Sequence, residues 1–264
     1  MRRFSITALA CILGIFLYAQ DKNEALKQAS ANAVNPIAQV IKFQLQPNYY
    51  IFHGGGDQLN LTTRVIVPIK GIFLPFIKTS NKKLFSLPRL ELPLTSQTFG
   101  EGSEKNATGL GDILLVDILA IKAPWGKYGV GPCFGFPTAT NSVLGSGKWT
   151  AGLAGIILYN KNPKWMAGAV IQQYFSYAGD PGRPSRNYMM FQPYLNLILE
   201  KGWFLMLNPI CTFDWQNGDY TVPLPLGFGK AMAKNLSMYL MPEYIVSGPT
   251  AKSFVIQFNL NTMF

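Results

Sequence analysis

The sequence predicts an all-β fold, a transmembrane antiparallel up-and-down β-barrel of about twelve strands (range ten to fourteen), with a short N-terminal helix. Three observations predict it. Apolar and polar residues alternate through many successive segments, and a signal for export precedes those segments. Charged residues make up only 14% of the chain, against roughly 25% in typical soluble domains. A soluble protein so poor in charge would expose apolar surface to water, whereas a barrel turns that surface toward lipid.

Residues 1–19 have the organisation of a cleaved signal peptide. Arg2 and Arg3 precede an apolar run over residues 6–18, which ends at the small residue Ala19. One alternative is a membrane-anchor helix, but the run is shorter than the roughly 20 apolar residues that such a helix needs. A lipoprotein attached through Cys11 is another alternative, although little of the apolar run precedes that cysteine. We therefore expect export, with the mature chain starting near residue 20.

Residues 20–36 form the predicted helical N-terminal segment. Its Ala, Lys, Glu and Gln content favours a helix over residues 21–34, and Pro36 disfavours helical geometry at Asn35. Three roles remain open for this segment: a plug inside the barrel, a helix at the periplasmic rim, or a frayed leader.

Residues 37–264 are predicted to form the barrel, because alternation places odd and even residues on opposite faces of a strand. In the first strand Ile41 and Phe43 share one face, and Lys42 and Gln44 share the other. The strands are predicted at residues 38–52, 58–70, 84–97, 109–122, 128–138, 148–159, 164–177, 188–199, 203–215, 220–230, 235–246 and 252–264.

The charged residues indicate which face meets the lumen. An Arg that faces lipid at the bilayer midplane costs about 2–4 kcal/mol, so the charged face should point inward. A soluble antiparallel sandwich also alternates, but the repeated agreement of the charges favours the barrel. The side chains predicted by this parity to line the lumen are Lys42, Gln44, Gln46, Asn60, Arg64, Arg89, Glu91 and Glu243.

The connections alternate in length, as expected for short periplasmic turns and longer outer loops. Those after the fourth, sixth, eighth and tenth strands are short, and those after the third, fifth and seventh are longer and polar. The link at 71–83 is the exception, since it is long and apolar on the turn side. In the fifth strand Gly129, Gly131 and Gly135 share a face, where they either leave room in the lumen or allow close packing of the wall; close packing is favoured.

The expected partners follow from the membrane location. They are outer-membrane lipid, lipopolysaccharide, whose phosphates suit a chain with a net charge of +10, and a small-molecule solute. Phe264 ends the last strand in the position of the terminal aromatic that outer-membrane proteins present to the barrel assembly machinery. Export and low charge density argue against a nucleic-acid partner.

The sequence contains no catalytic or metal-binding constellation. His53 is the one histidine and stands beside three glycines that read as a hairpin turn. Cys133 and Cys211 each lie singly in an apolar strand pattern, where they either pair or stay free as packing residues, the latter being favoured. We therefore expect no cofactor, no metal and no enzymatic activity.

Several motifs together resemble one family, the outer-membrane β-barrel proteins associated with the meta-cleavage pathway of phenol degradation. The resemblance runs from about residue 24 to the C-terminus, and residues 129–149 are its most specific part. It implies an outer-membrane channel or transporter for small hydrophobic or aromatic solutes. The motifs are NPIA at 35–38, TGLGDI at 108–113, VGP at 130–132, FPTAT at 136–140, LGSGKW at 144–149 and FSYAGD at 175–180.

Three functions follow, in order of preference. The first is a passive channel for small solutes. The second is a structural or surface-interaction barrel with a filled lumen. The third is a barrel lipid hydrolase, which is least favoured because it would depend on His53.

Overall fold

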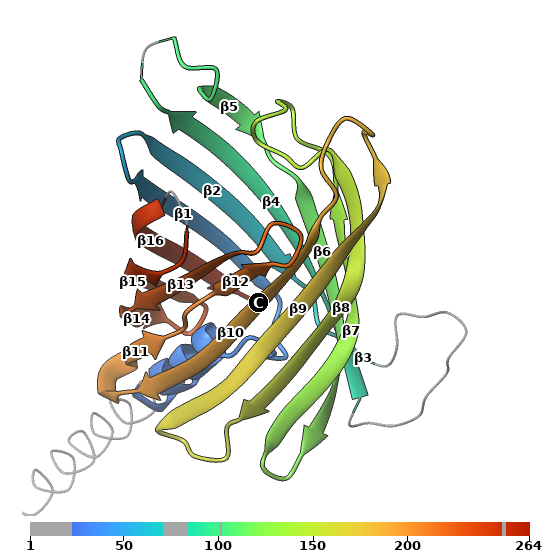
Figure 1. Cartoon of the computed structure of the whole chain (residues 1–264). Helices are drawn as coiled ribbons and strands as arrows, with labels where there is room; N and C mark the ends of the chain where they lie inside the picture. Colours follow the sequence, from blue (N-terminus) through green and yellow to red (C-terminus); the bar gives the residue numbers. More distant parts are fainter. Residues whose placement is uncertain (1–22, 71–83, 101, 250–251) are drawn as a thin grey trace, which may run out of the picture.

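The computed structural model describes residues 23–70, 84–100, 102–249 and 252–264. These residues form a single antiparallel sheet that closes into a barrel of 12 strands (Figure 1), with 66% of the chain in strands. The predicted fold class and strand number are confirmed. The predicted signal peptide at 1–19 and the unusual link at 71–83 lie outside the described residues.

The twelve passes are built from sixteen strand segments, because four passes consist of two segments each. In chain order the segments are β1 (Lys42–Phe52), β2 (Asp57–Ile66), β3 (Ile69–Lys70), β4 (Leu84–Thr98), β5 (Ala107–Leu110), β6 (Ile113–Ala123), β7 (Gly126–Phe136), β8 (Lys148–Tyr159), β9 (Trp165–Gly179), β10 (Asn187–Ile198), β11 (Trp203–Leu207), β12 (Cys211–Asp214), β13 (Asp219–Pro225), β14 (Gly227–Ala233), β15 (Leu236–Ser247) and β16 (Lys252–Met263).

The prediction of unbroken strands is wrong in the four divided passes. Three of the breaks contain or adjoin Pro68, Pro209 or Pro225, and proline has no N–H with which to continue a ladder. The fourth break, at Gly111 and Asp112, has another cause. There the Asp112 carboxylate accepts hydrogen bonds from an outer loop, so this stretch of backbone leaves the ladder.

The barrel is closed by the pairing of β1 with β16. The register runs from Lys42 opposite Met263 to Phe52 opposite Lys252. Beyond the strand ends, the Ile41 N–H donates to the Phe264 carbonyl at 3.1 Å, and the Phe264 N–H donates to the Ile41 carbonyl at 2.9 Å. Closure leaves the sheet without a free edge.

The two faces of the wall differ as a membrane barrel requires. Apolar side chains such as Leu59, Leu153 and Phe258 are exposed on the outside. The end of the barrel with the short turns is called the turn end, and the end with the longer loops is called the loop end. Aromatic pairs lie toward both, for example Tyr159 with Trp165 at the turn end and Phe213 with Trp215 at the loop end. Aromatic rings favour the two membrane–water interfaces, so the outer face fits a bilayer with the barrel axis across it.

A helix over residues 23–34 lies within the turn end of the barrel (Figure 1). Its Ala29, Ala33 and Val34 are buried in one apolar cluster with inward side chains from many strands, among them Phe85 and Leu158. Of the three roles left open for this segment, the arrangement fits a plug. Within the described parts of the chain, no helix has both the length and the apolar character needed to cross a membrane.

Close packing of the wall accounts for a glycine of β7. A Cβ atom on Gly131 would meet the backbone carbonyl of Asp117 on the neighbouring β6. A strand carbonyl that is fixed in its ladder has little freedom to move, so this glycine allows the wall to pack rather than enlarging the lumen.

We predict that Gly131→Val prevents folding of the barrel, because its side chain clashes with strand backbone. Refolding into detergent, followed by the heat-dependent shift of the folded band in gel electrophoresis, measures the effect. Val130→Ala, on the exposed outer side of the same strand, serves as the control and should refold normally. Equal refolding yields for the two variants would contradict the packing argument.

Candidate functional site in the barrel lumen

Three charged side chains of the inner face form an ionic cluster: Arg64 on β2, with Arg89 and Glu91 on β4. Arg64 and Glu91 are register partners, and Arg64 Nη2 lies 3.0 Å from Glu91 Oε2. Arg89 Nε lies 2.8 Å from Glu91 Oε1. Two cations therefore share one carboxylate, and the ionic cluster has a net positive charge.

Amide side chains of β1 extend the ionic cluster along the wall. Arg64 Nη1 donates to Gln44 Oε1 at 3.4 Å and to Gln46 Oε1 at 3.3 Å. Gln44 in turn donates to Asn261 on β16. These contacts form because residues two apart on a strand share a face, so the ionic cluster continues across the β1–β16 seam.

A hydrogen bond across the lumen marks a narrow level of the barrel. Arg89 Nη2 donates to Gln172 Oε1 on β9 at 3.1 Å, although β6, β7 and β8 separate β4 from β9 in the sheet. The Tyr174 hydroxyl donates to the same oxygen at 3.0 Å. Side chains of strands that lie four passes apart in the barrel therefore meet at the level of the ionic cluster.

The structure brings together five of the eight side chains that parity predicted for the lumen: Gln44, Gln46, Arg64, Arg89 and Glu91. The other three lie elsewhere on the inner face. Asn60 donates to Thr95 Oγ1 at 2.7 Å, Glu243 is buried on β15, and Lys42 lies at the turn end beside the helix.

Polar groups of the wall hold the last turn of the helix and the residues after it. Lys42 Nζ donates to the carbonyls of Ala33 at 3.4 Å and Asn35 at 2.7 Å. Lys127 Nζ donates to the Ile37 carbonyl at 2.9 Å. The final carbonyls of a helix have no partner within it and carry partial negative charge, so Lys42 stabilises the docked helix through Ala33. Lys127 holds the residues that follow the helix.

The first turns of the helix are held at the rim. Lys27 Nζ lies 3.1 Å from Glu200 Oε1, and the Asn23 side chain donates to Glu200 Oε2 at 3.0 Å. The hydrogen bond from Asn23 and the nearby Lys27 ammonium lower the pKa of Glu200, and Glu200 raises the pKa of Lys27. The Glu200 carboxylate therefore stabilises the docked helix fully at a pH above its ordinary pKa. This stabilisation is lost as the pH falls through the lowered pKa that Glu200 has in the folded barrel.

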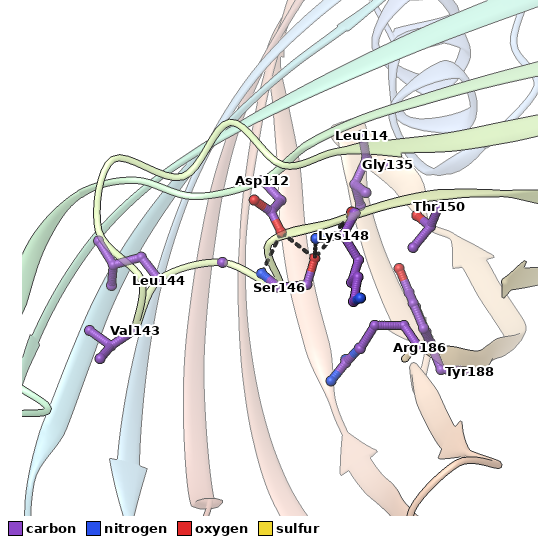
Figure 2. Close-up of a pocket in the computed structure, with 11 residues that line it drawn as sticks. Asp112, Leu114, Gly135, Val143, Leu144, Ser146, Lys148, Thr150, Arg186 and Tyr188 are labelled. Atoms are coloured by element: carbon purple, nitrogen blue, oxygen red, sulfur yellow. Dashed lines mark hydrogen bonds between the residues drawn. The ribbon is translucent and has the colours of Figure 1, made fainter. Parts of the chain in front are cut away.

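The loop end of the lumen is hollow. A cavity of about 380 Å³, here called the outer cavity, is lined by Asp112, Leu144, Lys148, Arg186 and Tyr188 among others (Figure 2). A second cavity of about 260 Å³ shares Arg186 and Tyr188 with it. At the base, the space beside Ile37 is only about 20 Å³. In this conformation the lumen is open toward the loops and nearly filled above the helix.

Other candidate chemistry is sparse. Among the described residues, no group of three or more His, Cys, Asp or Glu side chains is placed to hold a metal ion. His53 is exposed at the turn between β1 and β2. Cys133 and Cys211 are free and buried.

Sequence reasoning missed several polar side chains of the lumen. Gln172 and Tyr174 share a parity on β9 and could have been found by extending the alternation to that strand. Lys148 and Arg186 stand at or just before the first residue of a strand, where parity gives little guidance. The cavity between them depends on a folded loop that alternation does not describe.

We predict that Glu91→Gln lowers the free energy of unfolding by about 1–3 kcal/mol, because both arginines of this partly buried cluster then lose their charged hydrogen-bond acceptor. Guanidinium unfolding in detergent micelles, followed by tryptophan fluorescence, checks the value. Glu104→Gln, in an exposed outer loop, is the control and should change little. A loss equal to that of the control would show that the ionic cluster does not depend on Glu91.

The comparisons with known proteins show the fold of this chain. The sequence matches no protein-family model and no curated protein. An outer membrane channel from Pseudomonas putida F1 is similar in structure, with a TM-score of 0.69, 13% identity and coverage of 88% of this chain and 100% of that one. The NanC porin is also similar, with a TM-score of 0.52, 8% identity and coverage of 84% and 98%. So is outer membrane phospholipase A from Escherichia coli, with a TM-score of 0.50, 10% identity and coverage of 89% and 97%. The chain has the outer-membrane β-barrel fold.

Proposed function

We propose that this chain is an outer-membrane channel through which small solutes, hydrophobic and aromatic compounds among them, diffuse passively. The observation that carries the proposal is the ionic cluster in mid-lumen. The side chains of Arg64, Arg89 and Glu91 are 22%, 21% and 13% exposed. Even a fully buried ion triad can often be replaced by well-packed apolar side chains at no cost or with a gain of about 1–4 kcal/mol. A barrel with a purely structural role would gain from an apolar filling, so the polar interior supports a path for hydrated or polar groups.

The helix over residues 23–34 is the element that closes this path. Its buried face is made of small side chains, including Ala29, Ser30 and Ala33, which pack against the wall at the base. A few polar contacts hold its ends. Passage of a solute therefore requires the helix to shift, and the conformation described above is the closed one.

The range of solutes and the location are part of the same proposal. The resemblance of several motifs to the phenol-degradation family supports small hydrophobic or aromatic solutes. The apolar outer face and the basic balance of the chain support residence in the outer membrane, in contact with lipid and lipopolysaccharide. The exposed ring of Phe264 at the end of the barrel supports recognition of the last strand by the barrel assembly machinery.

A variant without residues 20–36 should conduct several-fold more current in planar bilayers than the mature chain, because the base is then open. The heat-dependent gel shift controls for folding of the barrel. Lys42→Met, which removes the donor to two carbonyls near the helix end, should act in the same direction through more frequent opening. If folded protein of both forms gives no channel events, the chain is instead a structural barrel with a filled lumen.

The net charge of the ionic cluster predicts a preference for anions. In a potassium chloride gradient the reversal potential should have the sign of anion selectivity. Arg89→Gln should move it toward zero, because this change leaves one cation against one carboxylate. Lys234→Gln, which alters an exposed turn, should leave it unchanged. An unchanged potential in the Arg89 variant would place selectivity elsewhere in the lumen.

A further inference from the structure

The outer cavity has a wall that is fixed in advance of any ligand. The loop over residues 137–147 folds inward against Asp112, whose Oδ2 accepts hydrogen bonds from the Ser146 N–H at 2.6 Å and from the Ser146 hydroxyl at 2.8 Å. Asp112 Oδ1 accepts from the Ala139 N–H at 3.3 Å. One carboxylate therefore anchors both ends of the loop.

A second loop holds the first in place. Arg183 Nη2 donates to the carbonyl of Ser142 at 2.5 Å and to that of Gly145. The residues between these anchors, Val143 and Leu144, line the outer cavity as an apolar wall. In Figure 2 they lie on the far side of Ser146 from Arg186 and Tyr188. Hydrogen bonds from the loop to the Asp112 carboxylate, and from Arg183 to the carbonyls of the loop, therefore keep the apolar wall in position.

Two cations on the other side of the cavity keep hydrogen-bond donors available. Within the described residues Lys148 Nζ has no acceptor, and the Nε of Arg186 is buried without a hydrogen-bond partner. The closest carboxylate to Arg186 is that of Asp214, at 3.9 Å. That oxygen of Asp214, Oδ2, already accepts from the Asn217 side-chain amide at 3.0 Å, so it competes only weakly for the guanidinium.

An aromatic ring lies beside these cations. The Arg186 guanidinium stands over the Tyr188 ring, 5.3 Å from its centroid, and the Tyr188 ring stacks on Tyr174 at 4.9 Å. Figure 2 shows Lys148 and Arg186 projecting into one space with Tyr188 alongside. Contact with both neighbours fixes the orientation of Tyr188, whose ring borders the cavity.

We infer that the outer cavity is a binding site for a small organic carboxylate with an apolar body. The carboxylate accepts hydrogen bonds from Arg186 and Lys148, and the body packs between Tyr188 and the apolar wall of Val143 and Leu144. The volume of about 380 Å³ falls in the range of small-molecule sites, roughly 300–1,000 Å³. This inference rests on the proposed channel function, for which it names the class of solute that is bound at the entrance.

The residues that line the cavity favour a ligand that has both a carboxylate and an apolar body. A neutral aromatic compound would cover the apolar wall but would displace water from the half-exposed Arg186 guanidinium and the Lys148 ammonium without replacing its hydrogen bonds. An inorganic anion would pair with the cations but would leave the apolar wall and the tyrosine ring in contact with water.

Calorimetric titration of the detergent-solubilised full chain tests the site with three probes: benzoate, benzyl alcohol and inorganic sulfate. Benzoate should bind at least about tenfold more tightly than the other two, as expected when a charged hydrogen bond or the apolar contact is missing. Arg186→Gln should weaken benzoate binding by a similar factor, and Lys148→Gln by less. Lys234→Gln, in an exposed turn at the opposite end, should bind as the parent does.

Several results would overturn the inference. Equal affinity for benzyl alcohol would reveal an apolar pocket without anion recognition, and equal affinity for sulfate would reveal a simple anion site. No benzoate binding, or unchanged binding in a folded Arg186→Gln variant, would exclude the site. The titration needs no bilayer, so the two proposals can fail separately. Benzoate binding without channel events would refute the channel function but support the binding site. Channel events without benzoate binding would support the channel function but refute the binding site.

Discussion

The whole structure depends on the requirement that every backbone N–H and C=O group within a bilayer finds a partner in the protein. The pairing of β1 with β16 meets this requirement at the one place where a sheet would otherwise end. Once closed, the wall has an outside and an inside with different solvents, and the two-residue period of the strands distributes side chains between them. The apolar outer face, the polar lumen and the position of the helix all follow from this closure.

Inside the barrel, the lumen changes character along its axis. The loop end is hollow and carries cations and an aromatic ring, and hydrogen bonds of the ionic cluster cross the middle. The base holds the helix, which packs in an apolar cluster and accepts hydrogen bonds from the wall. The polar groups of the middle level are costly to bury unless they are paired, and here Arg64, Arg89 and Glu91 pair with one another and with amides of two strands, β1 and β9. This arrangement combines a defined constriction with a wide entrance.

The wall could be predicted from the sequence because alternation is a local property. The residues of β1, for example, separate into two faces without any knowledge of their neighbours, and the charges then indicate which face is inward. Contacts between distant strands were beyond such reasoning. The Arg89–Gln172 bond depends on barrel diameter and strand tilt, and the anchoring of a loop by Asp112 depends on the break between β5 and β6. Prolines at strand interruptions gave a signal that a simple count of alternating residues overlooks.

The covalent link between the helix and the wall has a consequence for closure of the lumen. Residues 35–41 join the end of the helix to β1, and a link of this length spans at most about 25 Å. A helix that leaves the base therefore remains within reach of the space it vacated, at an effective concentration on the order of millimolar. Return of the helix to the base is then an intramolecular step, so its rate does not depend on the protein concentration. The open state would therefore be short-lived, and a solute in the lumen would lengthen its lifetime.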